Sequence, residues 1–145
     1  MSRRFIQYAA ILGALSVALG AFGTHTLKKY ADADILAVFE TGIRYQFFHT
    51  LALLAVGILY RRMPGKVMEW SGILFISGIV LFSGSLYLMT FFHILEAGSL
   101  RGIGAITPLG GLCFIGGWIC LFIQSLRPSV HHHHRSRESQ TDEQT

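Results

Sequence analysis

Charged residues are scarce in this chain of 145 residues. Asp, Glu, Lys and Arg together make up 14% of the sequence, whereas hydrophobic residues make up 52%. A soluble domain usually carries about 25% charged residues. The deficit disfavours a soluble fold and indicates a membrane protein, and the length leaves room for one domain.

Several signatures of catalysis and cofactor binding are absent too. The two cysteines, Cys113 and Cys120, lie in one apolar segment, about 10 Å apart along a helix axis, too far for a disulfide. There is no nucleophile motif such as GxSxG, and no glycine opens a nucleotide-binding loop after a strand. The basic residues flank apolar runs instead of forming a nucleic-acid patch. We therefore predict no catalytic residue, no cofactor and no nucleic-acid partner.

The sequence does contain four long apolar runs. A helix needs about 20 mostly apolar residues to span a bilayer, and backbone amides in hydrocarbon must be paired within helices. The four predicted spans cover residues 5–23, 41–60, 70–92 and 105–123. We predict an all-α polytopic membrane protein, a four-transmembrane-helix bundle within residues 1–126.

The charges of the loops predict the orientation. Lys and Arg accumulate in cytoplasmic loops. If the chain crosses four times, the side that carries both termini holds Arg3, Arg4, Arg61, Arg62, Lys66, Arg127, Arg135 and Arg137. The opposite side holds only Lys28, Lys29 and Arg101, with Arg44 counted as intramembrane. We expect both termini to be cytoplasmic.

The two ends of the chain allow other interpretations. Arg3 and Arg4 before an apolar run resemble a secretory signal, but the run exceeds the usual 7 to 15 residues, which favours an uncleaved span. The segment 127–145 has no apolar periodicity, so we predict a disordered cytoplasmic tail. Its run His131–His134 can bind metal loosely, although a tolerated low-complexity tail is the simpler interpretation.

The segment before the second span has two interpretations. Asp32 or Asp34 is a suitable N-cap, and apolar residues follow at helical spacing. One long helix can therefore run from about Asp34 into the second span. The alternative is a short interfacial helix that is broken at Gly42.

Small residues recur at helical spacing and predict the packing faces. Helices in lipid associate through close approach at small residues, and a spacing near 3.5 is typical of left-handed bundles. The predicted packing positions are Gly13, Gly20, Gly78, Ser85, Gly110, Cys113 and Gly117.

The second span begins with polar residues. Glu40 and Arg44 can pair at i, i+4, whereas Gln46 and His49 fall inside the apolar layer. Polar groups at that depth are costly in lipid, so we expect the stripe that contains Gln46 and His49 to point into the bundle. A hydrogen bond to a neighbouring helix is the structural interpretation of His49.

Most polar groups without a solvent role gather at one end of the predicted bundle. We hypothesise an outward-facing polar vestibule that binds a small ligand, a proton or a lipid headgroup. The candidate ligand-binding residues are His25, Glu40, Arg44, Tyr45, Gln46, His49, Tyr87 and His93. We predict no metal site, because the three histidines lie on separate segments without ligand spacing.

Four collinear blocks of sequence resemble a known family. They are "LGAFGTHTLKK" (19–29), "ETGIRYQFFHTLALL" (40–54), "LFSGSLYLM" (81–89) and "ITPLGGLCFIGGW" (106–118). They are similar to the small membrane family that includes transmembrane protein 256, whose bacterial members are uncharacterised. Thr24 departs from the small residue expected there. The resemblance implies a multi-pass protein of the cell inner membrane, with no accepted substrate, cofactor or mechanism.

Two functions from different classes remain open, while a third class, a membrane-embedded enzyme, would need a co-purified cofactor or a water-accessible base. The first is a binding or transport protein that uses the vestibule. The second is a structural or assembly partner of other membrane proteins, docked through the small-residue faces. The expected partners are the lipid bilayer and, through those faces, further copies of the chain or other membrane subunits.

Overall fold

The chain folds into a bundle of helices. The computed structural model describes residues 1–95 and 101–126, without the side chains of residues 101 and 103. The elements in order are α1 (Ser2–His25), η1 (Leu27–Lys29), α2 (Ala33–Leu59), α3 (Lys66–Gly78), η2 (Ile79–Ser83), α4 (Gly84–Ile94), α5 (Arg101–Gly104) and α6 (Ile106–Ser125). No strand occurs within the described residues. The predicted tail 127–145 lies outside them.

The structure confirms four membrane-length helices. By length and composition, the helical segments Ser2–Lys29, Ala33–Leu59, Lys66–Ile94 and Ile106–Ser125 are each able to cross a membrane. The third joins α3 and α4 through η2, a π-helical turn. The predicted all-α, four-span fold is therefore correct, although the helices extend beyond several of the predicted span ends.

The second span is one long helix. Asp32 caps its first turn, because Asp32 Oδ1 accepts a hydrogen bond of 2.8 Å from the Ile35 amide. Gly42 lies inside the helix and is buried. Of the two interpretations of this segment, the continuous helix is confirmed.

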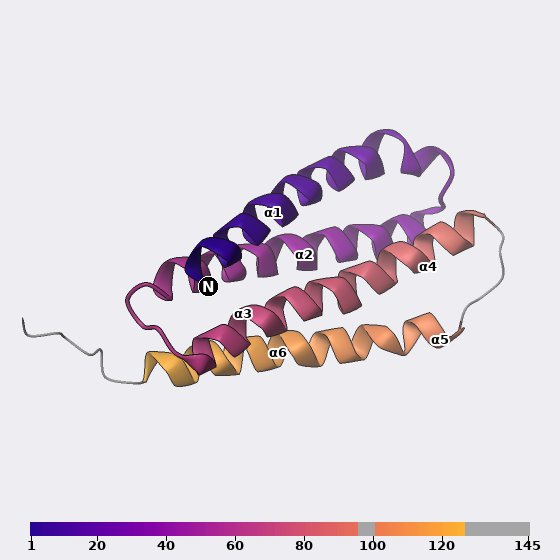
Figure 1. Cartoon of the computed structure of the whole chain (residues 1–145). Helices are drawn as coiled ribbons and strands as arrows, with labels where there is room; N and C mark the ends of the chain where they lie inside the picture. Colours follow the sequence, from indigo (N-terminus) through magenta and orange to yellow (C-terminus); the bar gives the residue numbers. More distant parts are fainter. Residues whose placement is uncertain (96–100, 127–145) are drawn as a thin grey trace, which may run out of the picture.

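Two spans lie between two edge helices (Figure 1). Helix α1 packs chiefly along α2, and α6 packs along α3 and η2. Helix α2 also contacts α3, η2 and α4, so these elements form the middle of the bundle, with α1 and α6 at opposite edges.

The apolar core occupies the end of the bundle that holds the N-terminus. Its side chains come from α1, α2, α3, η2 and α6 and include Phe5, Leu53, Val56, Met68 and Phe75. Leu53, Val56, Met68 and Phe75 have no exposed surface. The packing of this core holds the helices together at the end of the bundle near the N-terminus. The polar residues of α2 lie nearer the other end, toward η1 and the end of α4.

Candidate functional site

Gln46 connects three helices. Its side chain is only 2% exposed. Its Nε2 donates to the Leu12 carbonyl on α1 (3.1 Å), and its Oε1 accepts from the Tyr87 hydroxyl on α4 (2.9 Å). A buried amide with both ends bonded is stabilising instead of costly. The prediction that Gln46 points into the bundle is confirmed, and the structure adds its two hydrogen-bond partners, Leu12 and Tyr87.

Gly42 allows this bridge to form. A Cβ at position 42 would lie 2.7 Å from Tyr87 Cε1, a distance that real contacts essentially never show. The absent side chain lets the Tyr87 ring lie against α2 and reach Gln46 one turn further on. The spacing Gly42–Gln46 is the sequence signal for this arrangement, but the partner on α4 could not be read from it.

His49 lies in an aromatic cluster. Its Nδ1 is 2.8 Å from the Tyr45 carbonyl; because a carbonyl only accepts, Nδ1 carries the proton in this contact. The imidazole lies parallel to the Phe114 ring on α6, with centroids 3.5 Å apart and an interplanar angle of 9°. Tyr45, Phe75 and Trp118 are its other aromatic neighbours. Sequence analysis did not identify Phe114 and Trp118, whose i, i+4 spacing was their only signal.

A cleft lies between the C-terminal half of α1 and the N-terminal half of α2. Its volume is about 340 Å³. The residues that line it are Ser16, Val17, Gly20, Gly23, Thr24, Glu40, Ile43, Arg44, Phe47 and Phe48. Ser16 and Thr24 donate their hydroxyls to carbonyls of their own helix. The charged groups of the cleft are therefore the side chains of Glu40 and Arg44. The α1 half of this lining was not predicted.

Glu40 and Arg44 do not form an ion pair with each other. Both are exposed and one turn apart on α2. Within residues 1–95 and 101–126, the structure has one contact at ion-pair distance, between His93 Nε2 and Asp32 Oδ2 at 3.6 Å, which is an ion pair when the imidazole is protonated. That pair joins the end of α4 to the cap of α2. The expected i, i+4 pair of Glu40 with Arg44 is absent, and both groups are available to the cleft.

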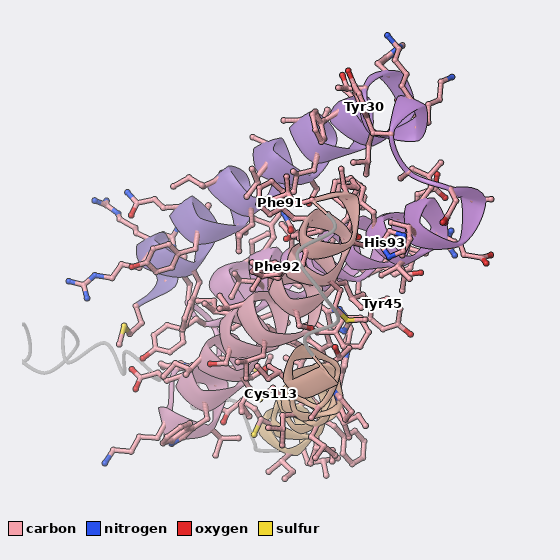
Figure 2. The ribbon with its side chains drawn as sticks, turned by 90° about the vertical axis from the view of Figure 1, so that its right-hand side faces the viewer. Tyr30, Tyr45, Phe91, Phe92, His93 and Cys113 are labelled. Carbon is pink, nitrogen blue, oxygen red and sulfur yellow. The ribbon has the colours of Figure 1, made fainter. Side chains whose placement is uncertain are left out.

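The remaining candidate residues lie apart from the cleft. His25 is exposed at the end of α1. Tyr45 is 40% exposed and stacks on Phe82 at a centroid distance of 4.5 Å. Figure 2, which looks along the bundle, shows Tyr45 and His93 on the same side of it and Tyr30 on another.

The eight candidates therefore form separate groups instead of one vestibule. Gln46 bonds Tyr87, and Tyr45 stacks beside His49 at 5.9 Å. Glu40 and Arg44 line the cleft, and His93 pairs with Asp32. In the described part of the chain, no three His, Cys, Asp or Glu side chains lie together as metal ligands. Neither Gln46 nor His49 lines the cleft, and ligand binding by either residue stays a prediction.

The small residues fall into two classes. A Cβ at Gly117 would lie 2.8 Å from the Phe75 ring, one at Gly110 would lie 2.7 Å from Phe82 Cβ, and one at Gly78 would overlap the Phe114 ring. Ser85 Oγ is 2.7 Å from Thr107 Oγ1 and bridges α4 to α6. These small residues therefore lie where helices approach closely.

The other small residues do not make close contacts. A Cβ at Gly13 would make an ordinary 3.6 Å contact with Thr50, whereas one at Gly20 would meet nothing within 4 Å. Gly20 thus faces the cleft, and Cys113 is half-buried on α6.

Comparison with known proteins places these features in a set of uncharacterised membrane proteins. Residues 19–111 match the family described as protein of unknown function (DUF423). The chain is 40% identical over 126 residues to the UPF0382 inner membrane protein YgdD of Escherichia coli K12, covering 87% of this chain and 92% of that protein.

Relatives from other bacteria agree. The chain is 43% identical over 123 residues to the UPF0382 membrane protein SSP2132 of Staphylococcus saprophyticus, covering 85% of this chain and 97% of that protein. It is 40% identical over 124 residues to the UPF0382 membrane protein YwdK of Bacillus subtilis, covering 85% and 96% respectively. No solved structure matches. None of these matches tests the resemblance to transmembrane protein 256, which stays a prediction.

Proposed function

Because the chain belongs to the DUF423 family of UPF0382 membrane proteins, and so is an integral membrane protein, we propose that it binds a small zwitterionic ligand in the cleft between α1 and α2. The ligand class is a compound with one cationic amine and one anionic phosphate or carboxylate. The headgroup of a zwitterionic lipid belongs to this class.

One observation carries the proposal. Glu40 and Arg44 line the same cleft, one turn apart, without forming an ion pair with each other. Opposite charges held side by side complement a ligand that itself carries both charges, with the amine on Glu40 and the anion on Arg44. A cleft of about 340 Å³ also falls within the range of small-molecule sites, which is about 300 to 1,000 Å³.

The rest of the cleft supports a ligand with an apolar part. Below the two charges the lining is mostly apolar, with Phe47 and Phe48 from α2 and Val17 from α1. Gly20 leaves room in this lining, because a Cβ there would meet nothing within 4 Å. A lipid, whose headgroup is joined to acyl chains, has this distribution of polarity.

We further propose that the protein lies in the inner membrane with both termini in the cytoplasm. The name of the Escherichia coli relative supports this membrane, and the excess of Lys and Arg on the terminal side supports this orientation. The cleft then opens toward the outside. In intact cells, an Arg44→Cys variant should react with an impermeant thiol reagent, whereas an Arg62→Cys variant should react only after lysis. The reverse pattern would refute the orientation.

The binding experiment uses three related probes. Purified protein in detergent is titrated with O-phosphoethanolamine, with ethanolamine and with glycerol phosphate, and binding is followed by calorimetry. The zwitterion should bind most tightly. Glu40→Gln and Arg44→Gln should each weaken it about tenfold or more, since a hydrogen bond to a charged group contributes about 1.5 to 3 kcal/mol.

Asp34→Asn provides the matched control. Asp34 is an exposed acid in the first turn of α2, outside the cleft lining. This variant should bind like the wild type. The proposal fails if the zwitterion shows no preference over the two singly charged probes, or if all three variants weaken it equally.

The assembly function has less support. Gly78, Gly110 and Gly117 contact side chains of the same chain, so these small-residue faces are already occupied inside the bundle. Docking of other subunits would have to use other surfaces.

A further inference from the structure

A second, apolar groove lies on the other side of the α1–α2 contact. Its volume is about 440 Å³. It runs between α1 with η1 and α4, and its walls include Leu19, Phe22, Leu27, Leu88 and Phe91. Almost all of its lining surface is apolar. This groove shares no lining residue with the cleft that holds Glu40 and Arg44.

Aromatic side chains form its base. Phe39 of α2 lies 5.2 Å from the Tyr87 ring and 6.4 Å from the Phe22 ring, measured between centroids. In Figure 2, Tyr30 marks the α1 side and Phe91 lies on α4. The groove stays open because α1 packs on α2 and not on α4.

The length of the groove indicates what fits it. On α1 and η1 the lining runs from Leu19 to Leu27, which is about 12 Å at 1.5 Å per residue; on α4 it runs from Tyr87 to Ile94, about 10 Å. One leaflet contributes about half of the 30 Å hydrocarbon layer. A groove of this length fits an acyl chain from one leaflet, whereas a spanning helix of a second subunit would need about twice that length.

The charge at the groove's outer end indicates the headgroup. Leu27 and Tyr30 line the groove, and Lys28 and Lys29 lie between them in sequence, with exposed side chains in the same turn. Two ammonium groups next to the mouth of an acyl-chain groove complement a phosphate without a neutralising amine. We propose that this groove binds one anionic phospholipid, with an acyl chain between α1 and α4 and its phosphate on Lys28 and Lys29.

Native mass spectrometry can test this site. Full-length protein in detergent is stripped of lipid and then mixed with phosphatidylglycerol or with a diacylglycerol of identical acyl chains, which has no phosphate. The wild type should retain phosphatidylglycerol preferentially. A Lys28→Gln/Lys29→Gln variant should lose about fivefold in this preference per lysine, which corresponds to about 1 kcal/mol each.

Two controls isolate the groove. Arg61→Gln/Arg62→Gln makes the same charge change at the opposite end of α2, where both residues are exposed, and should keep the preference. Leu88→Trp fills the groove from a side chain that is 49% exposed, so the core is untouched, and it should reduce retention of both lipids.

Each other outcome overturns the proposal. Equal loss in the two charge variants means a nonspecific charge effect. Unchanged retention in Leu88→Trp means that no chain enters the groove, and loss of a dimer in that variant instead of lipid identifies a second copy as the occupant. Arg44→Gln distinguishes this proposal from the zwitterion site, because it should weaken O-phosphoethanolamine and leave retention of phosphatidylglycerol unchanged.

Discussion

The two edges of the bundle use small residues in opposite ways. Where α6 meets α3 and η2, Gly110 and Gly117 bring the helices so close that a Cβ at either would clash with Phe82 or Phe75. Where α1 meets α2, Gly20 faces open space and a cleft follows the contact. The α6 edge is closed at both of these glycines. The α1 edge is open at Gly20 but close at Gly23, where a Cβ would lie 3.1 Å from the Phe39 ring.

The difference shows that spacing alone does not make a packing face. Both stripes repeat small residues every three or four positions, but the α1 stripe includes Val17, which is 68% exposed. Gly110 and Gly117 of α6 are each matched by a phenylalanine of the facing helical segment. Helices in lipid gain from such interdigitated contacts, so the matched edge closes.

The largest effect is predicted for a substitution at the closed edge, where α6 meets η2. Gly110→Ala places a methyl group against Phe82, whose backbone cannot move aside by a change of rotamer. We expect destabilisation of about 1 to 3 kcal/mol, as for an overpacked core. Thermal unfolding in detergent measures it. The bridge between Ser85 and Thr107 should weaken as well.

Gly20→Ala is the matched variant at the open edge. A Cβ there meets nothing within 4 Å, and alanine is favoured over glycine in a helix by about 1 kcal/mol. This variant should be neutral or slightly more stable than the wild type. Equal destabilisation by both substitutions would show that the two edges do not differ.

The sequence predicts the helices well because their signal is local. Span length and apolar content predict the four spans, and burial in hydrocarbon excludes strands. The sequence left the continuity of α2 through Gly42 open, since glycine both weakens a helix and permits close packing. In the structure, Gly42 lies where α2 contacts Tyr87 of α4, a residue far along the chain. Its role is close packing within a continuous helix.

The candidate site is predicted less completely for a related reason. Helical periodicity correctly predicted that Gln46 and His49 point into the bundle, where they are 2% and 8% exposed. It could not say that Tyr87 and Phe114 would meet them, because those contacts depend on how separate helices pack. The sequence showed only that the candidate residues lie at a similar depth in the bundle, not which neighbours they face. We therefore expected one vestibule, whereas the structure holds these side chains in separate groups.

A medium effect is expected where α4 meets α2. Tyr87→Phe removes the hydroxyl that donates to Gln46, and Gln46→Leu removes the amide. In a double-mutant cycle the two should be coupled by about 0.6 to 1.7 kcal/mol, the range for hydrogen bonds between membrane helices. Unfolding of the two single variants, the double variant and the wild type gives this coupling.

Tyr8→Phe is the control for the cycle. Tyr8 is 49% exposed on α1, so combining Tyr8→Phe with Gln46→Leu should give additive effects. Coupling as large as that of Tyr87 would mean that the cycle reports a general change of the bundle instead of the bridge.

The smallest predicted effect concerns the end of the bundle where Asp32 both caps α2 and pairs with His93. Asp32→Ala removes both interactions and should cost about 1 kcal/mol, mostly from the cap. Asp32→Asn keeps a capping oxygen and removes only the ion pair, whose partners are 55% and 61% exposed. Exposed pairs contribute little because water and salt screen them, so Asp32→Asn should be close to the wild type in thermal unfolding. If Asn costs as much as Ala, the link from α4 to α2, and not the cap, stabilises this end of the bundle.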